Sequence, residues 1–498
     1  MGVIVRQGFK AALSNYIGMG LGFLSLFILF PLFYDPEKLG AIRIFIELGT
    51  VLSSFALMGT NYSVNRFFPF FKTSDHKNHG FFFWALIFPL IGFGILMLIL
   101  WIGGNQIFIF INPNALKYRE IFPMLILLVF IILYQVVSEV SCANHGRIAV
   151  PNFMREIAMR ALIIVAGLAY YFGLVNFNQS VWLIVGAYAV ALTGNIWFLS
   201  RLTKINLRPD FLFLKKNPTI KNEALRFTLF LFFSGIASLL FTKMDFFMIS
   251  ALQKNLSEVA VYSIGFYLAT FIEVPKRTIL QVATPIISGL MKDEKFEEVK
   301  TLNKKNGSNQ LLISGMLFFM IWLNIDNLYE IMPRGEFYQR GKWVVFFIGV
   351  SKLIDAVICG NSPIIVNSKF YHLSFISILV ALFSSIVYNY YFVSHYGLIG
   401  GALSTILVML SVGLCNFLIL QIKLKINPFH KDQLAILAVL SCFFAISFLG
   451  QWFDNPYIDS IIRSSIIGSV MVLVFFKLKL SLDFNQLLIS KLPILKKL

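Results

Sequence analysis

Ionisable side chains inside long apolar stretches are the residues of this sequence that could do chemistry. Arg43 and Glu47 lie in one such stretch, and Lys243 and Asp245 lie in another. Because charge is expensive in hydrocarbon, such residues tend to face a bundle interior or a water-filled cavity. There, a Lys or Arg could bind a phosphate, and a carboxylate whose pKa is raised by burial could relay a proton.

Two further stretches hold charges at helical spacing. Glu273, Lys276 and Arg277 lie in one, and Lys352 and Asp355 lie in the other. Residues three or four apart share a helix face, so Glu273 is expected to pair with Lys276 or Arg277. The same spacing predicts a Lys352–Asp355 pair. In the first group two cations share one carboxylate, beside a proline that can kink the helix, so one positive charge is left over.

The spacing rule also separates the first two groups. Arg43 and Glu47 are four residues apart and are expected to pair. Lys243 and Asp245 are two apart and point in different directions, so each needs a partner elsewhere. Three further charges lie nearer the ends of apolar stretches, namely Arg66, Glu139 and Arg160.

These positions give two predicted sets of site residues. The candidate substrate-binding cations are Lys276, Arg277, Lys243, Lys352 and Arg66. The candidate ion-coupling carboxylates are Glu273, Asp245, Asp355 and Glu47. The alternative is that the charges only pair with one another and fix the register of the helices. No catalytic set, metal-ligand spacing or cofactor motif is found, and the four cysteines form no CxxC pair.

Membrane-spanning helices are the elements that must position these residues. The sequence is 58% apolar and 13% charged, whereas a soluble domain has about 25% charged residues. Apolar runs near the roughly 20 residues needed to cross hydrocarbon recur along the chain. They predict about fourteen spans, at 11–34, 40–64, 81–103, 121–143, 153–175, 179–200, 226–251, 258–288, 308–325, 343–366, 372–393, 397–421, 432–452 and 459–478.

The distribution of Lys and Arg predicts that both ends of the chain are cytoplasmic. The 201–226 connection and the 291–307 connection are strongly basic, and so is the C-terminal tail. The predicted outer connections hold few cations, namely Lys38, Lys117, Arg119, Lys254, Arg334, Arg340, Lys342 and Arg463. The net charge of +18 is therefore explained by topology and attraction to anionic membrane lipid rather than by nucleic-acid binding.

The basic connections also predict how the helices are grouped. We expect an N-terminal six-helix bundle at 1–205, a basic cytoplasmic linker at 206–225 and a C-terminal six-helix bundle at 226–425. A terminal helix pair and basic tail would follow at 426–498. No loop is long enough for a soluble catalytic domain, and no GxxxxGK[ST] phosphate loop is present, so the chain is expected to be neither an enzyme nor an ATP-driven pump by itself.

Four stretches carry a resemblance to a known family. They read PLFYDPEKLGAIRIF with FALMGTNYSVNRFF (31–68), KMDFFMIS with VAVYSIGFYLATFIEVP and ATPIIS (243–288), GNSPIIVNSK (360–369) and HYGLIGGALSTIL (395–407). Together with the layout of six, six and two helices, they resemble the multidrug/oligosaccharidyl-lipid/polysaccharide (MOP) exporter superfamily. Within it, they are most similar to polysaccharide-biosynthesis flippases of the O-antigen and capsule type.

This resemblance implies a MATE-like, all-α architecture with two helical bundles around a central cavity. It implies a multi-pass protein of the inner (plasma) membrane that moves an undecaprenyl-diphosphate-linked oligosaccharide to the outer leaflet. Polysaccharide polymerase and assembly proteins would be partners. Three alternatives stay open at this point, namely an ion-coupled small-molecule or drug exporter of the same fold, a lipid II flippase, and a membrane enzyme acting on polyprenyl lipids.

Overall fold

The computed structural model describes residues 3–73, 78–112, 120–429, 431–447 and 450–491. Within these ranges the chain is helical and contains no strand, so the predicted all-α fold class is confirmed. The chain divides into two compact units, 1–260 and 261–498. The predicted outer cations Lys117 and Arg119, and part of the basic tail, lie outside the described residues.

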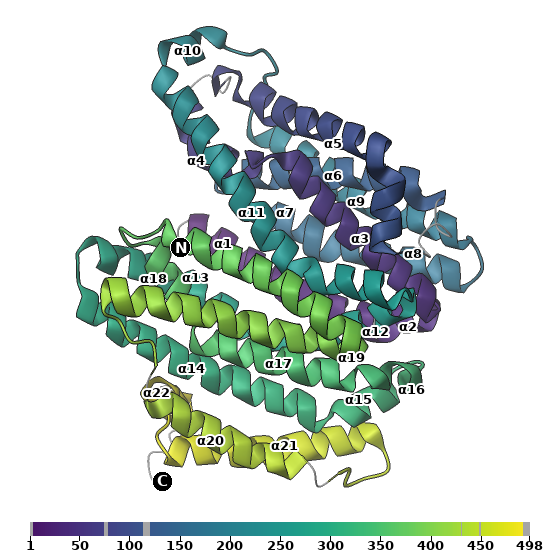
Figure 1. The fold of residues 1–498 in the computed structure, drawn as a ribbon, viewed down its shortest axis with the longest axis vertical. Helices are drawn as coiled ribbons and strands as arrows, with labels where there is room; N and C mark the ends of the chain where they lie inside the picture. Colours follow the sequence, from purple (N-terminus) through teal and green to yellow (C-terminus); the bar gives the residue numbers. More distant parts are fainter. Residues whose placement is uncertain (1–2, 74–77, 113–119, 430, 448–449, 492–498) are drawn as a thin grey trace. The chain divides into compact units, whose positions relative to one another are not determined.

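Unit 1 (1–260) runs from the purple to the teal helices of Figure 1. It contains α1 (Val3–Phe23), η1 (Leu24–Leu29), α2 (Phe30–Phe33), α3 (Pro36–Leu57), α4 (Thr60–Phe71), η2 (Asn78–Gly80), α5 (Phe81–Ile111), α6 (Phe122–Asn144), α7 (Ala149–Phe153), η4 (Met154–Ala158), α8 (Met159–Tyr171), α9 (Phe177–Leu202), α10 (Phe211–Lys216), α11 (Pro218–Gln253) and the start of α12 (Leu256–Thr270). Helix α3 packs against α5, α6 and α11, so it lies at the centre of the unit.

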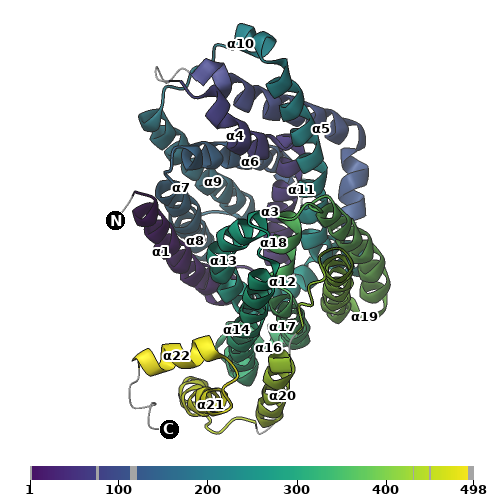
Figure 2. The same ribbon diagram turned by 90° about the vertical axis from the view of Figure 1, so that its left-hand side faces the viewer.

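Unit 2 (261–498) runs from teal to yellow. It contains the rest of α12, η5 (Phe271–Glu273), α13 (Val274–Lys292), α14 (Phe296–Leu323), α15 (Ile325–Ile331), α16 (Gly335–Tyr338), η6 (Gln339–Gly341), α17 (Lys342–Val357), α18 (Asn361–Val366), α19 (Leu373–Ile419), η7 (Leu420–Leu424), α20 (Lys431–Ile446), α21 (Pro456–Lys477) and α22 (Leu482–Lys491). Figure 2 shows the terminal pair α20 and α21 beside α14, and both helices contact it.

The described residues include nine helical stretches that are long and apolar enough to cross a membrane. A bent pair, α14 with α15, makes a tenth if it is one span. The other predicted spans coincide with shorter helices, because η4 interrupts the 153–175 segment and residues 358–360 separate α17 from α18. The chain is thus a multi-pass membrane protein, and the count of fourteen stays a prediction.

One helical stretch contains two of the predicted spans. Residues Leu373–Leu424 form one helical stretch of 52 residues, about 78 Å long at 1.5 Å per residue, which is more than twice the hydrocarbon thickness. The backbone breaks at Gly397, where φ is +56° and ψ is −128°. The Ser377 Oγ donates to Asn416 Oδ1 at 2.7 Å, and Tyr388 Oη lies 3.3 Å from Ser411 Oγ. These contacts make α19 an antiparallel hairpin.

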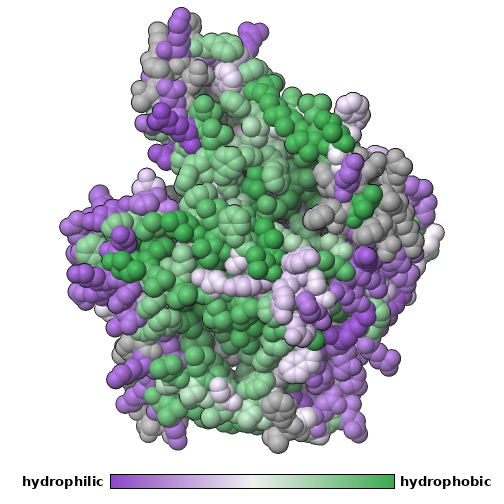
Figure 3. All heavy atoms as spheres, in the orientation of Figure 1, coloured by the Kyte–Doolittle hydropathy of each residue, from purple (hydrophilic) through white to green (hydrophobic). Residues whose placement is uncertain are grey.

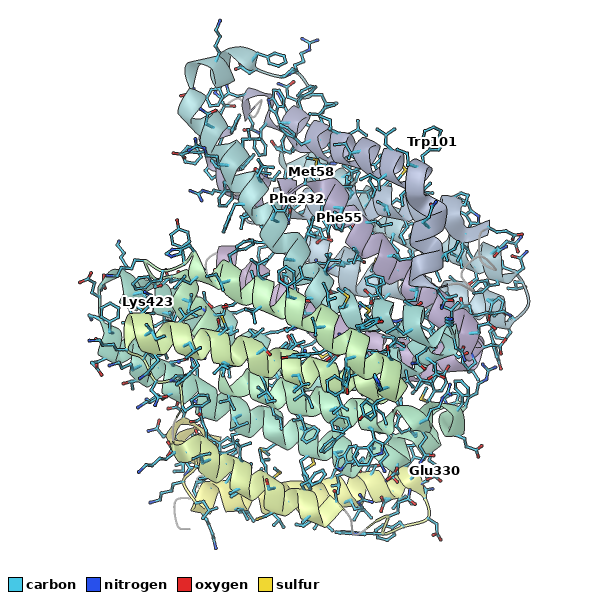
Figure 4. The ribbon with its side chains drawn as sticks, in the orientation of Figure 1. Phe55, Met58, Trp101, Phe232, Glu330 and Lys423 are labelled. Carbon is cyan, nitrogen blue, oxygen red and sulfur yellow. The ribbon has the colours of Figure 1, made fainter. Side chains whose placement is uncertain are left out.

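A second glycine permits close helix packing in unit 1. Gly59 separates α3 from α4 with φ of +76°, and a Cβ on it would lie 2.6 Å from the Thr228 carbonyl oxygen of α11. Met58 and Phe232 mark this approach in Figure 4. Trp101 of α5 instead points outward and is 84% exposed, as expected of a residue that faces lipid.

The connections between the helices of unit 1 form two groups, as the predicted topology requires. The His79 Nδ1 lies 2.8 Å from Asp210 Oδ2, which joins two connections expected on the inner side. At the other end of the helices, Lys38 donates to Tyr170 Oη at 2.7 Å, which joins a connection expected on the outer side to the end of α8. Inner and outer connections are therefore separated within the unit, and their assignment to the two sides of the membrane stays a prediction.

Unit 2 shows the same separation. Asn309 donates to Asp483 at 2.9 Å where the predicted 308–325 span begins, and Asn327 donates to Asp459 at 2.6 Å just beyond the end of that span. In Figure 3 hydrophobic residues cover the middle of the visible face of unit 2, and hydrophilic residues gather at its two ends. This is the pattern of helices that cross a bilayer side by side.

Arg463 is a correction to the expected outer cations. It lies within α21 and is 3% exposed, rather than in an outer loop. Its guanidinium donates to Asp459 Oδ2 at 3.0 Å and to the Gly450 carbonyl at 2.8 Å. It also donates to the Leu323 carbonyl at the end of α14. Arg463 therefore attaches the terminal helix α21 to the end of α14. The expectation of an outer loop did not indicate this contact.

Candidate functional site

A buried carboxylate with two cations occupies the middle of unit 1. Glu47 of α3 has a side chain that is 8% exposed. Lys243 of α11 places its Nζ 2.7 Å from Glu47 Oε2, and the Arg43 Nη2 lies 3.9 Å from Glu47 Oε1. The predicted Arg43–Glu47 pair is confirmed, and so is the need of Lys243 for a partner outside its own helix. We call these three residues the Glu47 cluster.

Asp245 is the remaining site residue of α11. It is also buried, at 6% exposure, two positions along the helix from Lys243. Helical geometry turns residues two apart by about 200°, so the two side chains leave α11 in different directions. The structure therefore places both predicted residues in the interior of the unit.

A second network in unit 1 joins residues that spacing did not connect. The Arg155 Nη1 donates to Glu139 Oε2 at 2.6 Å, and its Nε donates to Glu156 Oε1 at 3.1 Å. Arg160 donates to Glu156 Oε2 at 2.7 Å. The four-residue spacing of Glu156 and Arg160 could have identified one pair. The link from α6 to η4 depends on tertiary structure, so the sequence carried no signal for it.

Tyr188 of α9 lies near charges of both groups, namely Glu47 and Arg43 of the Glu47 cluster and Arg160 of the second network. The π-helical turn η4, which carries Arg155 and Glu156, lies in this region. Such turns occur frequently at functional sites because they re-aim side chains. Unit 1 thus contains two groups of paired charges among apolar helices.

Unit 2 contains a larger cluster, in which two helices exchange partners. We call Glu273, Lys276, Arg277, Lys352 and Asp355 the Glu273 cluster. The Lys352 Nζ lies 2.7 Å from Glu273 Oε2, and Lys276 pairs with Asp355. Both contacts run between the η5–α13 segment and α17. The predicted pairs Glu273–Lys276 and Lys352–Asp355 are therefore wrong, because each lysine reaches the carboxylate of the facing helix instead.

The third predicted pair of this cluster is confirmed. The Arg277 Nε lies 3.4 Å from Glu273 Oε1 across one helical turn. The Arg277 side chain is 65% exposed, whereas the other four side chains are 20% exposed or less. The cluster has three cations and two carboxylates, so the excess positive charge is displayed by its exposed member.

A 3₁₀ turn interrupts the α-helix beside this cluster. The 3₁₀ turn η5 joins α12 to α13, and Pro275 lies in the first turn of α13. The Ile272 carbonyl in this turn accepts a hydrogen bond from Ser314 Oγ of α14 at 2.8 Å. Gln310 donates to the same hydroxyl at 2.8 Å. The 3₁₀ turn is therefore held by a hydrogen bond from α14, beside the segment that places Glu273 and Lys276 opposite α17.

Arg66 differs from the other predicted cations. It is exposed on α4, and its guanidinium lies 4.2 Å from the Phe227 ring centroid and 5.6 Å from that of Phe67. In the part of the chain that the structure describes, no carboxylate pairs with it. Arg66 therefore carries a charge that no described carboxylate neutralises. Its guanidinium lies over an aromatic ring.

The two clusters can bind an anion more readily than they can hold a metal. Each has one more cation than carboxylate, and the lysines are fixed by short ion pairs. Across the described ranges, no three His, Cys, Asp or Glu side chains come together in a group that could hold a metal ion. Arg and Lys donors at partly buried positions can replace water around a phosphate.

Two solved structures resemble the chain over most of its length. The lipid II flippase MurJ, in an inward closed conformation, has a TM-score of 0.67 at 15% identity, covering 95% of this chain and 99% of that chain. An inward-facing multidrug resistance MATE family transporter of the MOP superfamily has a TM-score of 0.61 at 15% identity, covering 89% and 99%. No protein-family model and no curated protein matches the sequence. The predicted MATE-like architecture is confirmed, and the chain has the fold of the MOP exporters.

Proposed function

We propose that this protein is a flippase that moves an undecaprenyl-diphosphate-linked oligosaccharide from the cytoplasmic to the outer leaflet, for surface polysaccharide biosynthesis. The observation that most strongly supports this proposal is the excess of cations over carboxylates in the Glu47 and Glu273 clusters. Exporters of cationic compounds would be expected to have an acidic interior instead. The fold supports transport, and the cations support an anionic cargo.

The substrate explains why a flippase would keep such clusters. Moving a diphosphate and its sugars through hydrocarbon would remove water from charge, at a cost of tens of kcal/mol in a purely low-dielectric picture. A cationic cavity replaces that water with Arg and Lys donors. Alternating access would then expose the cavity to one leaflet at a time, while the lipid tail stays in the bilayer beside the helices.

The Glu273 cluster is the part of the proposed site that is most open to an anion. Arg277 is its exposed cation, and Lys276 lies on the preceding position of α13. We assign substrate binding to Lys276, Arg277, Lys243, Lys352 and Arg66. The protein would lie in the inner membrane with both termini cytoplasmic, and polysaccharide polymerase and assembly proteins would be its partners.

Ion coupling is assigned to Glu273, Asp245, Asp355 and Glu47, which are buried or half-buried carboxylates. Protonation of one of them would weaken its ion pair and free a lysine for the substrate. Transport in proteoliposomes is therefore expected to rise when a proton gradient is imposed. Transport that is indifferent to the gradient would remove this assignment and leave the flippase proposal intact.

The test of the proposed function is the double variant Lys276→Ala/Arg277→Ala in cells that lack the native copy. We expect surface polysaccharide to fall at least tenfold while the protein level in the membrane is unchanged. Lys292→Ala is the matched control, since it removes an exposed cation from the last turn of the same helix. Normal polysaccharide in the double variant at a normal protein level would refute the site.

A lipid II flippase is the second candidate, because the MurJ structure shares the fold over 95% of this chain. The two candidates differ in cargo and predict different phenotypes. Depletion of a lipid II flippase stops growth, whereas loss of a polysaccharide flippase removes a surface polymer. Growth and surface polymer are therefore measured together in the deletion strain.

A further inference from the structure

A groove at one end of unit 1 shares no lining residue with the Glu47 cluster or the Glu273 cluster. It has a volume of about 640 Å³, within the range of about 300–1,000 Å³ that is usual for small-molecule pockets. Its walls come from α1, from the α7–η4 segment and from the end of α9, including Phe198 and Leu202. Figure 2 shows α1, α7 and α9 beside one another, and α7 contacts both of the others.

Two walls of the groove repeat the same order of residues. On α1 the order is Lys10, Leu13 and Ile17, at spacings of three and four that keep them on one helix face. Along the other wall, Arg147 is followed by Val150 and then by Phe153 and Ile157. Each wall therefore begins with a cation and continues with apolar side chains in the same direction.

The mouth of the groove is positively charged and open. Lys10 and Arg147 are both exposed, and no Asp or Glu is among the described residues that line the groove. The Gln7 side chain accepts a hydrogen bond from the Ala149 backbone at 3.2 Å, which ties the start of α1 to α7 beside Arg147. The two cations are thus presented at the end of the groove that is predicted to be cytoplasmic.

The apolar part of the groove is also accessible. Leu13, Ile17 and Phe153 are 51%, 45% and 46% exposed, although they line a concave surface. An occupant that matches the whole groove needs an anionic head and an apolar chain. Arg can hold a phosphate through two hydrogen bonds, and each cation near the membrane surface attracts anionic lipid by about 1 kcal/mol.

We propose that this groove is a binding site for an anionic phospholipid of the surrounding membrane. Its phosphate contacts Lys10 and Arg147, and one acyl chain lies along Leu13 and Ile17 on one wall and Phe153 on the other. The site shares no residue with the proposed cargo site, and it does not depend on the identity of the cargo. A bound lipid would brace α1 against α7 and α9.

The test compares lipids with one head-group difference. Delipidated full-length protein is exposed to mixed micelles of phosphatidylglycerol or of phosphatidylcholine, and bound lipid is counted by native mass spectrometry. We expect phosphatidylglycerol to bind at least tenfold more tightly than phosphatidylcholine. Equal binding of the two lipids would overturn the proposal, because it would indicate an ordinary layer of surrounding lipid.

Variants then locate the lipid. Lys10→Ala/Arg147→Ala is expected to abolish the preference for phosphatidylglycerol, whereas Arg201→Ala is the matched control. Arg201 is an exposed cation of the last turn of α9 that does not line the groove. Loss of the preference in the control alone, or its survival in the double variant, would overturn the assignment.

A third variant keeps the test decisive if the double variant does not fold. Leu13→Trp fills the apolar part of the groove and leaves both cations in place, so it is expected to reduce phosphatidylglycerol binding at least fivefold. The last measurement uses inorganic phosphate alone. Phosphate is expected to stabilise the wild-type protein less than the lipid does. Equal stabilisation by phosphate, or undiminished lipid binding by Leu13→Trp, would exclude a lipid site.

Discussion

The two units neutralise their buried charges in different ways. In unit 1 a single carboxylate, Glu47, neutralises Lys243 from another helix, and no second acid pairs with that lysine among the described residues. In unit 2 each carboxylate pairs with a lysine of the facing helix, and each of these lysines also has a carboxylate three residues away on its own helix, whereas Lys243 has none at that spacing. The first arrangement is a fixed clamp, and the second can exchange partners.

This difference suggests different behaviour when helices move. If α13 and α17 separated during transport, Glu273 could turn to Lys276, and Asp355 could turn to Lys352, so neither carboxylate would be left unpaired. A separation of α3 from α11 would leave Lys243 without its carboxylate. We therefore expect the α13–α17 contact to open and close in the transport cycle and the α3–α11 contact to persist.

The largest expected effect is the loss of the fixed clamp. Glu47→Ala leaves Lys243 and Arg43 in the interior without a carboxylate, and breaking a buried pair by removing one partner costs about 3 kcal/mol or more. Thermal unfolding of the purified protein in detergent, followed by tryptophan fluorescence, measures the loss. Unchanged stability of this variant would show that Glu47 and Lys243 are not a clamp.

Its control is the double variant Glu47→Ala/Lys243→Ala, which removes the uncompensated lysine together with its partner. This variant should regain part of the stability, since Arg43 is then the one charge left over. A double variant that is less stable than Glu47→Ala would contradict the expected coupling between the two residues.

A smaller effect is expected in the Glu273 cluster. Lys276→Ala removes the cross-helix partner of Asp355, but Lys352 lies three residues away on the same helix and can replace it. The expected loss of stability is therefore about 1 kcal/mol, the usual scale of one hydrogen-bonded contact. The same thermal measurement checks it, and a loss as large as that of Glu47→Ala would contradict the exchange of partners.

The charge swap Glu273→Lys/Lys352→Glu sharpens this test. It keeps an ion pair between the two helices, but it places like charges three or four residues apart within each helix, so the exchange is no longer favourable. We expect a protein that folds, with surface polysaccharide reduced at least tenfold. Full transport by the swapped protein would show that exchange within the helices is not part of the cycle.

The sequence predicted the fold better than it predicted the ion pairs. Apolar length requires no knowledge of neighbours, so it located the long apolar helices, whereas the inner and outer sides inferred from basic residues stay a prediction. Helical spacing identified Arg43–Glu47 and Glu273–Arg277 because both partners lie on one helix face. The same rule misassigned Lys276 and Lys352, since it does not include the facing helix.

Spacing along one helix fails to predict ion pairs for the same reason elsewhere in the chain. Glu139 of α6 and Arg155 of η4 are brought together by tertiary structure, and Arg463 is buried because Asp459 and backbone carbonyls satisfy its guanidinium. Both depend on contacts between segments that are distant in sequence or separated by a loop. A residue's charge and hydropathic context therefore indicate that it needs a partner, but not which partner it has.

The smallest effects on stability are expected for the exposed arginines, one in each unit. Arg66→Lys weakens the stacking on Phe227, which costs about 0.5–1 kcal/mol. Arg277→Lys weakens an exposed contact with Glu273 and should cost less than about 0.5 kcal/mol. Both variants keep the positive charge, so thermal unfolding should differ little from wild type in either.

Transport distinguishes the two arginines, because lysine cannot hold a phosphate through two parallel hydrogen bonds. A fall in surface polysaccharide in Arg277→Lys, with a normal level in Arg66→Lys, would place the diphosphate at the Glu273 cluster. The reverse result would place it at Arg66, where the absence of a carboxylate partner among the described residues leaves the whole charge available. Normal polysaccharide in both variants would show that charge alone is sufficient, and the proposed two-point grip on phosphate would then be wrong.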